Sequence, residues 1–356
     1  MSATIKDVAR LAGVSVATVS RVLNGSAPVR DDTRARVLEV ARELRFAPNG
    51  AARALSRRRA GSLGVVLPDL YGEFFSELLR GIDQQAQRAG HSLLVSSSHH
   101  DAHGVSVAVR AMRGRVDGLL VMAPEVSGDA LDAVLPDGIP VVLLNRAPGL
   151  TAESVMVDNY GGAHAMTRHL LALGHKRIGF IAGAEDNADS DERELGYRTA
   201  LEGAGVPLDD TRYVRGDFTE DGGWRAMLSM LASGPRPTAI FAANDAMAIG
   251  ALSALRDADI EVPIDMAVVG FDDIPVARFL SPPLTTVRVG IAALGQRAAS
   301  LLLAALEQRA PPDHVPRCGV LPTELVVRSS CGAAFASTSE RANPGAPTTH
   351  LTSTRT

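Results

Sequence analysis

Four residues near the N-terminus have side chains suited to contacting the edges of DNA bases. Small groups and one arginine gather on one side of residues 16–24, at Val16, Ala17, Thr18 and Arg21. The other side of this stretch is apolar, at Val19, Val22 and Leu23. A helix whose exposed start carries small side chains can enter the major groove, where an arginine can donate hydrogen bonds to base edges. The pattern therefore predicts recognition of double-stranded DNA.

Two short helices joined by a tight turn are expected to position these side chains. Apolar residues recur at i, i+3, i+4 and i+7 within residues 5–12, which places them on one face of a first helix. Thr4 and Asp7 have the spacing of a capping box, and Gly13 can adopt the positive φ that ends a helix. Ser15 is expected to cap the second helix. Any two amphipathic helices around a glycine would show this periodicity, so a purely structural helix pair is the alternative.

The distribution of charge favours the DNA-binding interpretation. Residues 1–60 hold twelve Lys and Arg against five Asp and Glu, a net charge of +7, whereas the whole chain carries −4. The remaining residues therefore carry −11. A small basic region can release counterions from DNA phosphates, while the acidic remainder should not compete for nucleic acid.

The N-terminal sequence resembles a known family. Residues 7–24, Asp-Val-Ala-Arg-Leu-Ala-Gly-Val-Ser-Val-Ala-Thr-Val-Ser-Arg-Val-Leu-Asn, are similar to the helix-turn-helix of the lactose and galactose repressor (LacI/GalR) family. The resemblance continues through residues 33–37 and 41–55, which look like the family's third helix and hinge helix, and it reaches about residue 330. It implies a sequence-specific transcriptional regulator, most simply a repressor, that binds a palindromic operator as a homodimer.

The residues themselves support further helices after the first two. Asp31 and Asp32 can cap a helix over residues 33–44. Asn49 can cap a short hinge helix over residues 50–57, after Pro48 ends what precedes it. The apolar side chains expected to close a three-helix core are Val37, Val40, Ala41 and Leu44.

The candidate DNA-contacting residues fall in two groups. In the helix-turn-helix they are Thr4, Ser15, Val16, Ala17, Thr18, Ser20, Arg21 and Asn24. In the hinge they are Asn49, Ala52 and Leu55. Leu55 matches the residue that the family wedges into the minor groove at the operator centre, so the resemblance implies that Leu55→Ala weakens specific binding and lessens DNA bending.

Composition is typical of a water-soluble protein with several domains. At 356 residues the chain suits one small and two medium domains. No apolar run approaches the roughly eighteen residues of a membrane span, and the start lacks an apolar secretory segment, so we expect a cytoplasmic protein without a membrane partner. Cys318 and Cys331 have no metal-ligand spacing and are interpreted as incidental thiols rather than a disulfide.

After a charged linker at residues 57–61, apolar runs alternate with helical stretches. Strands are expected at residues 63–67, 93–95, 118–122 and 141–144, and again at 178–182, 239–242 and 267–271. Helices are expected at residues 74–89, 160–173, 195–204, 223–232 and 246–257. This βαβ alternation predicts doubly wound parallel sheets in two α/β lobes.

The resemblance implies the type I periplasmic-binding-protein architecture, in which the chain crosses between the lobes near Val157, Val289 and Cys318. The expected organisation is a DNA-binding domain at 1–60 and an effector-binding and dimerisation core at 61–330. The first lobe takes about 61–157 and 290–318, and the second takes about 158–289 and 319–330. Residues 332–356 lack apolar periodicity and are expected to be a disordered tail. No leucine-rich tetramerisation helix is evident, so a dimer is expected.

Polar and aromatic side chains follow several of the expected strands, where open α/β sheets bind ligands. Paired amide and carboxylate groups suit the vicinal hydroxyls of a sugar. The candidate effector contacts from strand ends are Tyr71, Phe74, Arg146, Asn244 and Asp272. By the resemblance, Arg193 matches the family's inducer-contacting arginine, and Phe218 falls where some members stack a ring on the sugar.

Each of these residues also has a structural interpretation. Asn244 could only cap the following helix, and Asp272 could be structural. Phe218 and Tyr71 could be packing residues, and Arg193 could form a surface ion pair. If Arg193 and Asp272 are effector contacts, Arg193→Ala and Asp272→Ala should each give a folded dimer that binds operator normally and no longer responds to its effector.

The effector itself is not assigned by the sequence. Met122 and Asn145 depart from the polar residue and the acid that the lactose repressor has at these places, and Arg146 beside Asn145 leaves a sugar acid possible. The cluster of His99, His100 and His103 is interpreted as a polar loop rather than a metal site, and no cofactor is expected.

Three classes of function stay open, with an effector-responsive repressor of carbohydrate or sugar-acid genes the preferred one. A small-molecule-binding protein without a DNA role is disfavoured because a basic helix-turn-helix precedes the lobes. A co-repressor-dependent regulator of nucleotide-type metabolism is a further alternative. An enzyme is disfavoured because the chain has no dinucleotide-binding glycine motif, phosphate-binding loop or nucleophile elbow.

Overall fold

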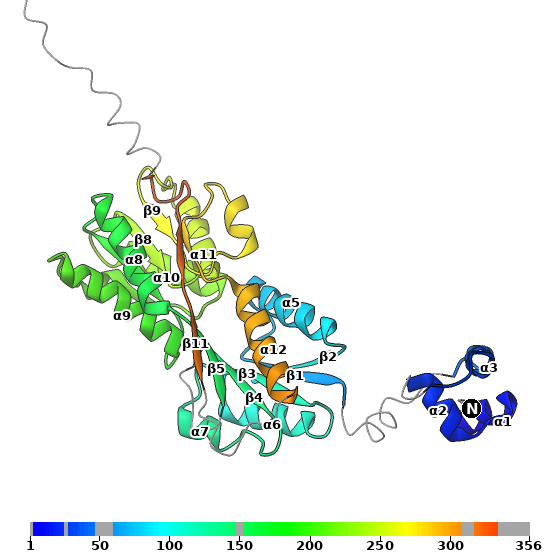
Figure 1. Cartoon of the computed structure of the whole chain (residues 1–356). Coiled ribbons are helices and arrows are strands. Elements are labelled where there is room, and N and C mark those ends of the chain that lie inside the picture. Colours follow the sequence, from blue (N-terminus) through cyan, green and yellow to red (C-terminus); the bar gives the residue numbers. More distant parts are fainter. Residues whose placement is uncertain (1–2, 25–27, 47–59, 147–151, 308–316, 334–356) are drawn as a thin grey trace, which may run out of the picture. The chain divides into compact units, whose positions relative to one another are not determined.

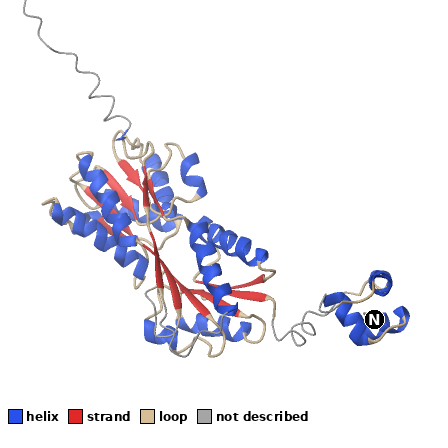
Figure 2. Cartoon of the chain, in the orientation of Figure 1, coloured by secondary structure: helices blue, strands red, loops and turns tan. Residues whose placement is uncertain are grey.

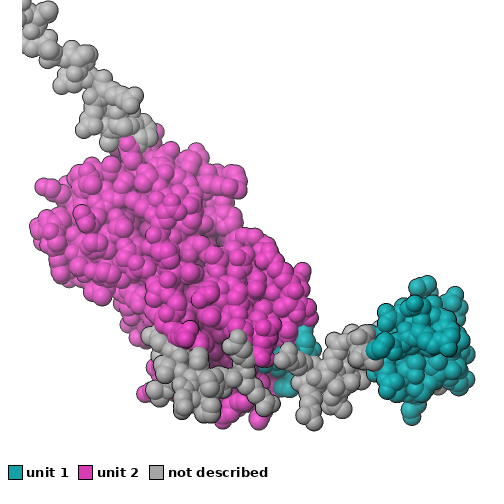
Figure 3. All heavy atoms as spheres, viewed as in Figure 1, with its two compact units in different colours: residues 1–61, 114–117 teal, residues 62–113, 118–356 magenta. Residues whose placement is uncertain are grey.

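A computed structural model describes residues 3–24, 28–46, 60–146, 152–307 and 317–333. The chain divides into two compact units, one comprising residues 1–61 with 114–117 and the other residues 62–113 with 118–356 (Figure 3). The N-terminal unit is helical, whereas the larger unit combines strands with covering helices (Figure 2).

The N-terminal head begins with two capped helices, as the sequence predicts. Helix α1 covers Ile5–Ala12, and its capping box is formed because Asp7 N donates to Thr4 Oγ1 at 3.4 Å while Thr4 N donates to Asp7 Oδ2 at 3.0 Å. Gly13 follows with a φ of 64°. Helix α2 covers Val16–Asn24, where Thr18 N donates to Ser15 Oγ at 3.1 Å. These local interactions set the angle at which α2 leaves the turn.

Helix α3 covers Asp31–Glu43 and completes the core of the head. It starts two residues before the expected residue 33, so Asp31 and Asp32 lie in its first turn, and the cap position Arg30 makes no side-chain capping bond. The two carboxylates still suit this helix end, where the backbone dipole is positive. The buried core comprises Val8, Ala9, Ala12, Val19, Val22, Val37 and Ala41, with Val40 and Leu44 packed at its edge. The hinge prediction for residues 49–57 lies outside the described residues.

The first lobe of the larger unit contains a parallel sheet with strand order β11-β5-β4-β3-β1-β2 among the described residues. Its strands are β1 (Ser62–Leu67), β2 (Ser92–Ser97), β3 (Gly118–Met122), β4 (Val141–Leu144), β5 (Glu153–Val157) and β11 (Cys318–Leu321). Its helices are α5 (Glu73–Arg88), α6 (Ala102–Met112), α7 (Gly128–Asp132) and α12 (Ile291–Glu307). Figure 1 shows α5 and α12 side by side against this sheet, and they are extensively in contact.

The second lobe has a parallel sheet with order β7-β6-β8-β9 in the described chain. Its strands are β6 (Ile178–Ala182), β7 (Tyr213–Arg215), β8 (Ala239–Ala242) and β9 (Ala267–Val269). Its helices are α8 (Asn159–Ala172), α9 (Ala188–Gly203), α10 (Glu220–Ala232) and α11 (Asp245–Asp257), with 3₁₀ turns η1 (Asp210–Arg212) and η2 (Pro275–Phe279). Helices α8 and α9 pack together, as do α10 and α11 (Figure 1).

Several boundaries differ from the sequence-based prediction. Helix α9 begins at Ala188 rather than near residue 195, because the Asn187 side chain caps it by accepting a bond from Ser190 N at 3.1 Å. The last crossing falls after Leu321 rather than at Cys318, because β11 is paired with β5 in the first sheet. Strand β12 (Glu324–Val326) then pairs antiparallel with β10 (Thr286–Arg288). The expected strand at residues 267–271 is shorter, since the chain turns after Val269.

None of the helices in the described chain has both the length and the apolar character needed to cross a membrane. Cys318 is exposed and Cys331 is buried, and both are free thiols.

Candidate effector pocket and DNA-reading helix

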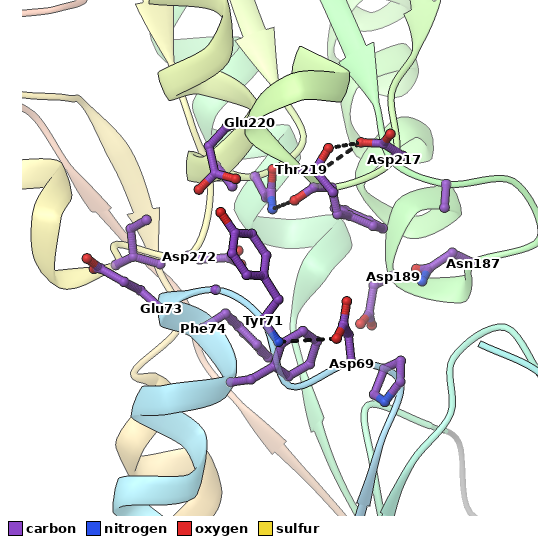
Figure 4. A pocket seen from close by; sticks show the side chains of 18 of the residues that line it. Asp69, Tyr71, Glu73, Phe74, Asn187, Asp189, Asp217, Thr219, Glu220 and Asp272 are labelled. Atoms are coloured by element: carbon purple, nitrogen blue, oxygen red, sulfur yellow. Dashed lines mark hydrogen bonds between the residues drawn. The ribbon is translucent and has the colours of Figure 1, made fainter. Parts of the chain in front are cut away.

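A pocket with a cavity volume of about 180 Å³ lies between the two lobes of the larger unit. Figure 4 shows Tyr71 and Phe74 of the first lobe facing Thr219 and Glu220 of the second. The most informative lining residues are Asp69, Tyr71, Glu73, Phe74, Phe75, His100, Met122, Asn187, Asp189, Arg193, Asp217, Phe218, Thr219, Glu220, Asn244 and Asp272. The mixed apolar and polar lining is typical of a small-molecule site.

The structure brings together all but one of the predicted effector contacts. Tyr71, Phe74, Arg193, Phe218, Asn244 and Asp272 line the same pocket. Arg146 does not: its guanidinium donates to the carbonyl oxygens of Ala123 at 3.2 Å and of Val126, and it lines a separate cavity. Backbone carbonyls of its own lobe hold the Arg146 side chain outside this pocket, so its role as an effector contact stays a prediction without support from this geometry.

Arg193 is a buried hub rather than a surface ion pair. Its Nε donates to Asn159 Oδ1 at 2.8 Å and its Nη1 donates to the Ala243 carbonyl at 2.6 Å. Its Nη2 lies 3.2 Å from Asp272 Oδ1, and the guanidinium carbon lies 4.0 Å from the Phe271 ring centroid. With its side chain 4% exposed, Arg193 fixes the floor of the pocket as well as lining it.

Asp272 lies at the end of the sheet in an uncommon backbone conformation, with a φ of 112°. Burial raises the pKa of its carboxyl to about 7, against the lowering effect of the nearby Arg193. Although Oδ1 is within ion-pair distance of Arg193, no donor is aligned with it for a hydrogen bond. Strained backbone and an unsatisfied buried oxygen together are features that mark ligand sites.

Asp189 links the lobes and was not singled out by the sequence. Its Oδ2 accepts from Asn145 Nδ2 of the first lobe at 3.0 Å, and its Oδ1 accepts from Asn159 Nδ2 at 2.9 Å. Burial raises the pKa of this carboxyl, while Arg193 opposes the rise. Helix α9 begins at Ala188, so Asp189 lies one turn before Arg193 on the same helix. A prediction that started this helix at Ala188 would have placed Asp189 beside Arg193.

Asn244 has the capping role that was the alternative to ligand binding, and it lines the pocket as well. Its Oδ1 accepts from Met247 N at 2.9 Å at the start of α11, and its Nδ2 donates to the Phe218 carbonyl at 3.0 Å. Neighbouring Asp245 is structural, because its carboxylate accepts from Thr286 Oγ1 at 2.5 Å and from Ile274 N at 2.9 Å.

Aromatic rings form the walls of the pocket. Phe218 has a φ of 65°, and its ring lies so close to Gly183 that a Cβ there would be 2.1 Å from the ring. Phe74 and Phe75 meet edge to face, with centroids 5.5 Å apart. Tyr71 stays 66% exposed at the mouth, so it is not a packing residue.

The histidine cluster is a polar loop in which His100 Nδ1 lies 3.2 Å from Glu125 Oε1. This hydrogen bond raises the pKa of His100. Within the described residues, no three His, Cys, Asp or Glu side chains are arranged to hold a metal ion.

The exposed start of α2 presents the predicted DNA-reading side chains. Val16, Ala17 and Arg21 are exposed, whereas Thr18 and Ser20 are half-buried and Thr18 Oγ1 lies 2.9 Å from Ser15 Oγ. Thr4 is exposed at the start of α1. Asn24 ends α2, and Asn49, Ala52 and Leu55 lie outside the described residues. The contacts of all these residues with DNA remain predictions.

A capped helix-turn-helix followed by a two-lobed α/β core with a pocket defines a class: ligand-responsive DNA-binding regulators. Residues 4–49 match the model for bacterial regulatory proteins of the lacI family, and residues 167–331 match that for the periplasmic binding protein-like domain. The chain belongs to the lacI family, and it is a DNA-binding transcriptional regulator.

The similarity to relatives and to solved structures extends over nearly the whole chain. The regulator GalS of Salmonella typhimurium is 41% identical over 306 residues, covering 84% of this chain and 89% of the relative. The repressor PurR of Haemophilus influenzae is 34% identical over 331 residues, covering 92% and 98%. The Lac repressor dimer bound to operator and an anti-inducer superposes with a TM-score of 0.83 at 29% identity, covering 93% and 99%. The regulator CelR in complex with cellobiose gives 0.70 at 34%, covering 92% and 99%.

Proposed function

We propose that this protein represses transcription by binding a two-fold operator as a homodimer, and that a small polyhydroxylated effector in the pocket controls this binding. The buried Arg193–Asp272 pair beneath aromatic walls is the observation that carries the proposal. Charged hydrogen-bonding groups grip hydroxyls, and rings contact the C–H face of a sugar. A role at the bacterial chromosome also places the protein in the cytoplasm and gives it a regulatory, not a catalytic, task.

The similar proteins support the proposal. The Lac repressor structure contains a dimer on its operator, and the CelR structure contains cellobiose. A dimer places two reading helices on half-sites related by the same two-fold axis, so its operator should be palindromic.

The pocket can control DNA binding through the relative position of the two lobes. Contacts between the lobes include Asn145 with Asp189, Asn187 Nδ2 with Glu125 Oε1 at 2.9 Å, and Glu73 Oε2 with Val276 N at 3.0 Å. An effector that binds one arrangement of the lobes better than another shifts the population between them. Differential affinity of this kind is the only way in which a ligand can change DNA binding.

Fluorescence anisotropy with a labelled operator tests the DNA role, using salt titration as the main variable. We expect affinity to fall steeply with salt, because phosphate contacts by the +7 head release counterions. Arg256→Ala on α11 is a matched control that removes an exposed arginine of the core and should leave the salt slope unchanged. An affinity independent of salt would refute the DNA-reading role.

A further inference from the structure

We propose that the pocket accepts an uncharged polyhydroxylated effector and discriminates against counterparts that carry a carboxylate or a phosphate. The inference rests on the proposed function and specifies the chemical class of its effector. It resolves the choice between sugar and sugar acid that the sequence leaves open.

Carboxylates dominate the charged lining of the pocket. They are Asp69, Glu73, Asp189, Asp217, Glu220 and Asp272, whereas the lining residues that can carry positive charge are Arg193 and His100. The six carboxylates come from both lobes, so they surround the pocket rather than lying at one edge (Figure 4). An anionic ligand would be desolvated against this lining, and juxtaposed like charges oppose binding.

The two positive groups offer no free charge to an anion. Arg193 is already engaged with Asp272, with Asn159 and with the Ala243 carbonyl. His100 is paired with Glu125 at 3.2 Å. Arg146, the residue that could have met an acid group, is bound to backbone carbonyls beside another cavity. An anion would therefore have to displace a partner from Arg193 or His100.

Asp272 offers a carboxylate acceptor to the pocket. Its side chain is 5% exposed, and its Oδ1 accepts no aligned hydrogen bond within the described protein. A ligand hydroxyl can donate to the Asp272 carboxylate, which lines the pocket, whereas a ligand carboxylate would place like charges together.

The aromatic lining also favours a neutral carbohydrate. Phe74 of the first lobe and Phe218 of the second both line the pocket, and Tyr71 is exposed at its mouth. Rings of this kind cover the C–H face of a carbohydrate without requiring any charge. The geometry thus combines hydroxyl acceptors at the floor with apolar walls, which is suited to a neutral sugar.

The test compares sugars with their own acid derivatives on the full-length protein. Galactose with galacturonate and glucose with glucuronate differ only in the C6 group, which is a hydroxymethyl in the sugar and a carboxylate in the acid. Thermal shift and isothermal titration calorimetry should show the neutral member of a binding pair at least about tenfold tighter, as expected for an uncompensated like-charge contact. An acid that binds as tightly as its neutral partner, or more tightly, overturns the inference.

Two charge variants assign the selectivity to the lining. Asp272→Asn should narrow the ratio between neutral and acidic partners, and it should weaken the neutral sugar by about tenfold through loss of a charged acceptor. Glu220→Gln at the rim should narrow the same ratio without disturbing buried groups, so the test survives if Asp272→Asn fails to fold. Glu202→Gln on exposed α9 surface is the control that should leave the ratio unchanged. An unchanged ratio in Glu220→Gln and in any folded Asp272→Asn overturns the assignment.

Operator binding measured with the same compounds separates the two levels of the proposal. If an acid binds and shifts operator affinity, the inference fails while the proposed regulatory function stands. If neither sugars nor acids bind, the polyhydroxylated effector of the proposed function fails together with the inference.

Discussion

The head and the pocket are built from sequence in opposite ways. The candidate DNA-reading residues of α2 lie within one turn-and-helix segment, and Val16, Ala17 and Arg21 are exposed. The pocket residues come from segments more than two hundred positions apart, as Tyr71 and Asp272 illustrate, and several are buried. The exposed side chains of α2 can therefore change with little effect on folding, whereas pocket side chains also hold the lobe together.

The largest expected effect tests whether pocket side chains hold the lobe together. Arg193→Ala should lower the free energy of unfolding of the core by about 3–5 kcal/mol, because it leaves Asp272 buried without its counter-ion. This revises the sequence-based expectation of an undisturbed fold. Urea unfolding followed by the fluorescence of Trp224, the chain's one tryptophan, reports the core because Trp224 lies on α10.

Arg198→Ala on the same helix is the matched control. Its partner is Glu194 at 2.6 Å, but the arginine side chain is 32% exposed, so the loss should stay below about 1 kcal/mol. Equal effects of the two substitutions would break the contrast between a structural pocket residue and a surface residue.

The raised pKa of Asp272 should make the stability of the core depend on pH. The pKa of Asp272 is about 7 in the folded protein, above its ordinary value of 3.8, so the folded state holds a proton that the unfolded state has lost. Its contribution to stability therefore falls as pH rises from about 4 to 7, by at most about 1.4 kcal/mol per pH unit. Asp272→Asn should remove this component when urea midpoints are compared at pH 5, 6 and 7. Parallel wild-type and variant profiles would show that Asp272 titrates normally.

In the head, one exposed side chain should affect binding and little else. Arg21→Ala should weaken operator binding by about 1–3 kcal/mol and relax specificity at one base pair. Anisotropy with operators mutated one position at a time measures both quantities. Unchanged core unfolding and sugar affinity are expected, and a uniform loss across all operators would make Arg21 a phosphate contact instead.

The smallest effect concerns the capping box of α1. Thr4→Ala should lower the stability of the head by about 1 kcal/mol, because Asp7 N loses its acceptor. Far-UV circular dichroism of thermal unfolding detects the change in the head, while Trp224 fluorescence should not move. Thr4→Ser, which keeps the hydroxyl, should restore most of the loss.

The same contrast explains what the sequence predicts and what it misses. Caps such as Thr4 with Asp7 depend on residues three positions apart, so their spacing is sufficient evidence. Strand-end residues such as Asn244 and Asp272 are also predictable, because parallel strands end at a common edge. The family resemblance supplies Arg193 and Phe218.

The misses arise from tertiary contacts. Nothing near Arg146 in sequence shows that the carbonyls of Ala123 and Val126 will bind it. Asp189 joins Asn145 and Asn159 across the lobes, a network that no local pattern contains. Short strands such as β7 and β12 are equally hard to recognise, because three residues carry no periodicity.

The operator-binding isotherm of Asp272→Asn, recorded with and without the neutral sugar that binds the wild type, tests most directly whether DNA reading and effector response occupy separate sites. The account predicts wild-type operator affinity without sugar, and a clearly smaller shift than that of the wild type when sugar is added at the concentration that half-saturates the wild type. Loss of operator affinity in the absence of sugar, or a full wild-type shift, would contradict it.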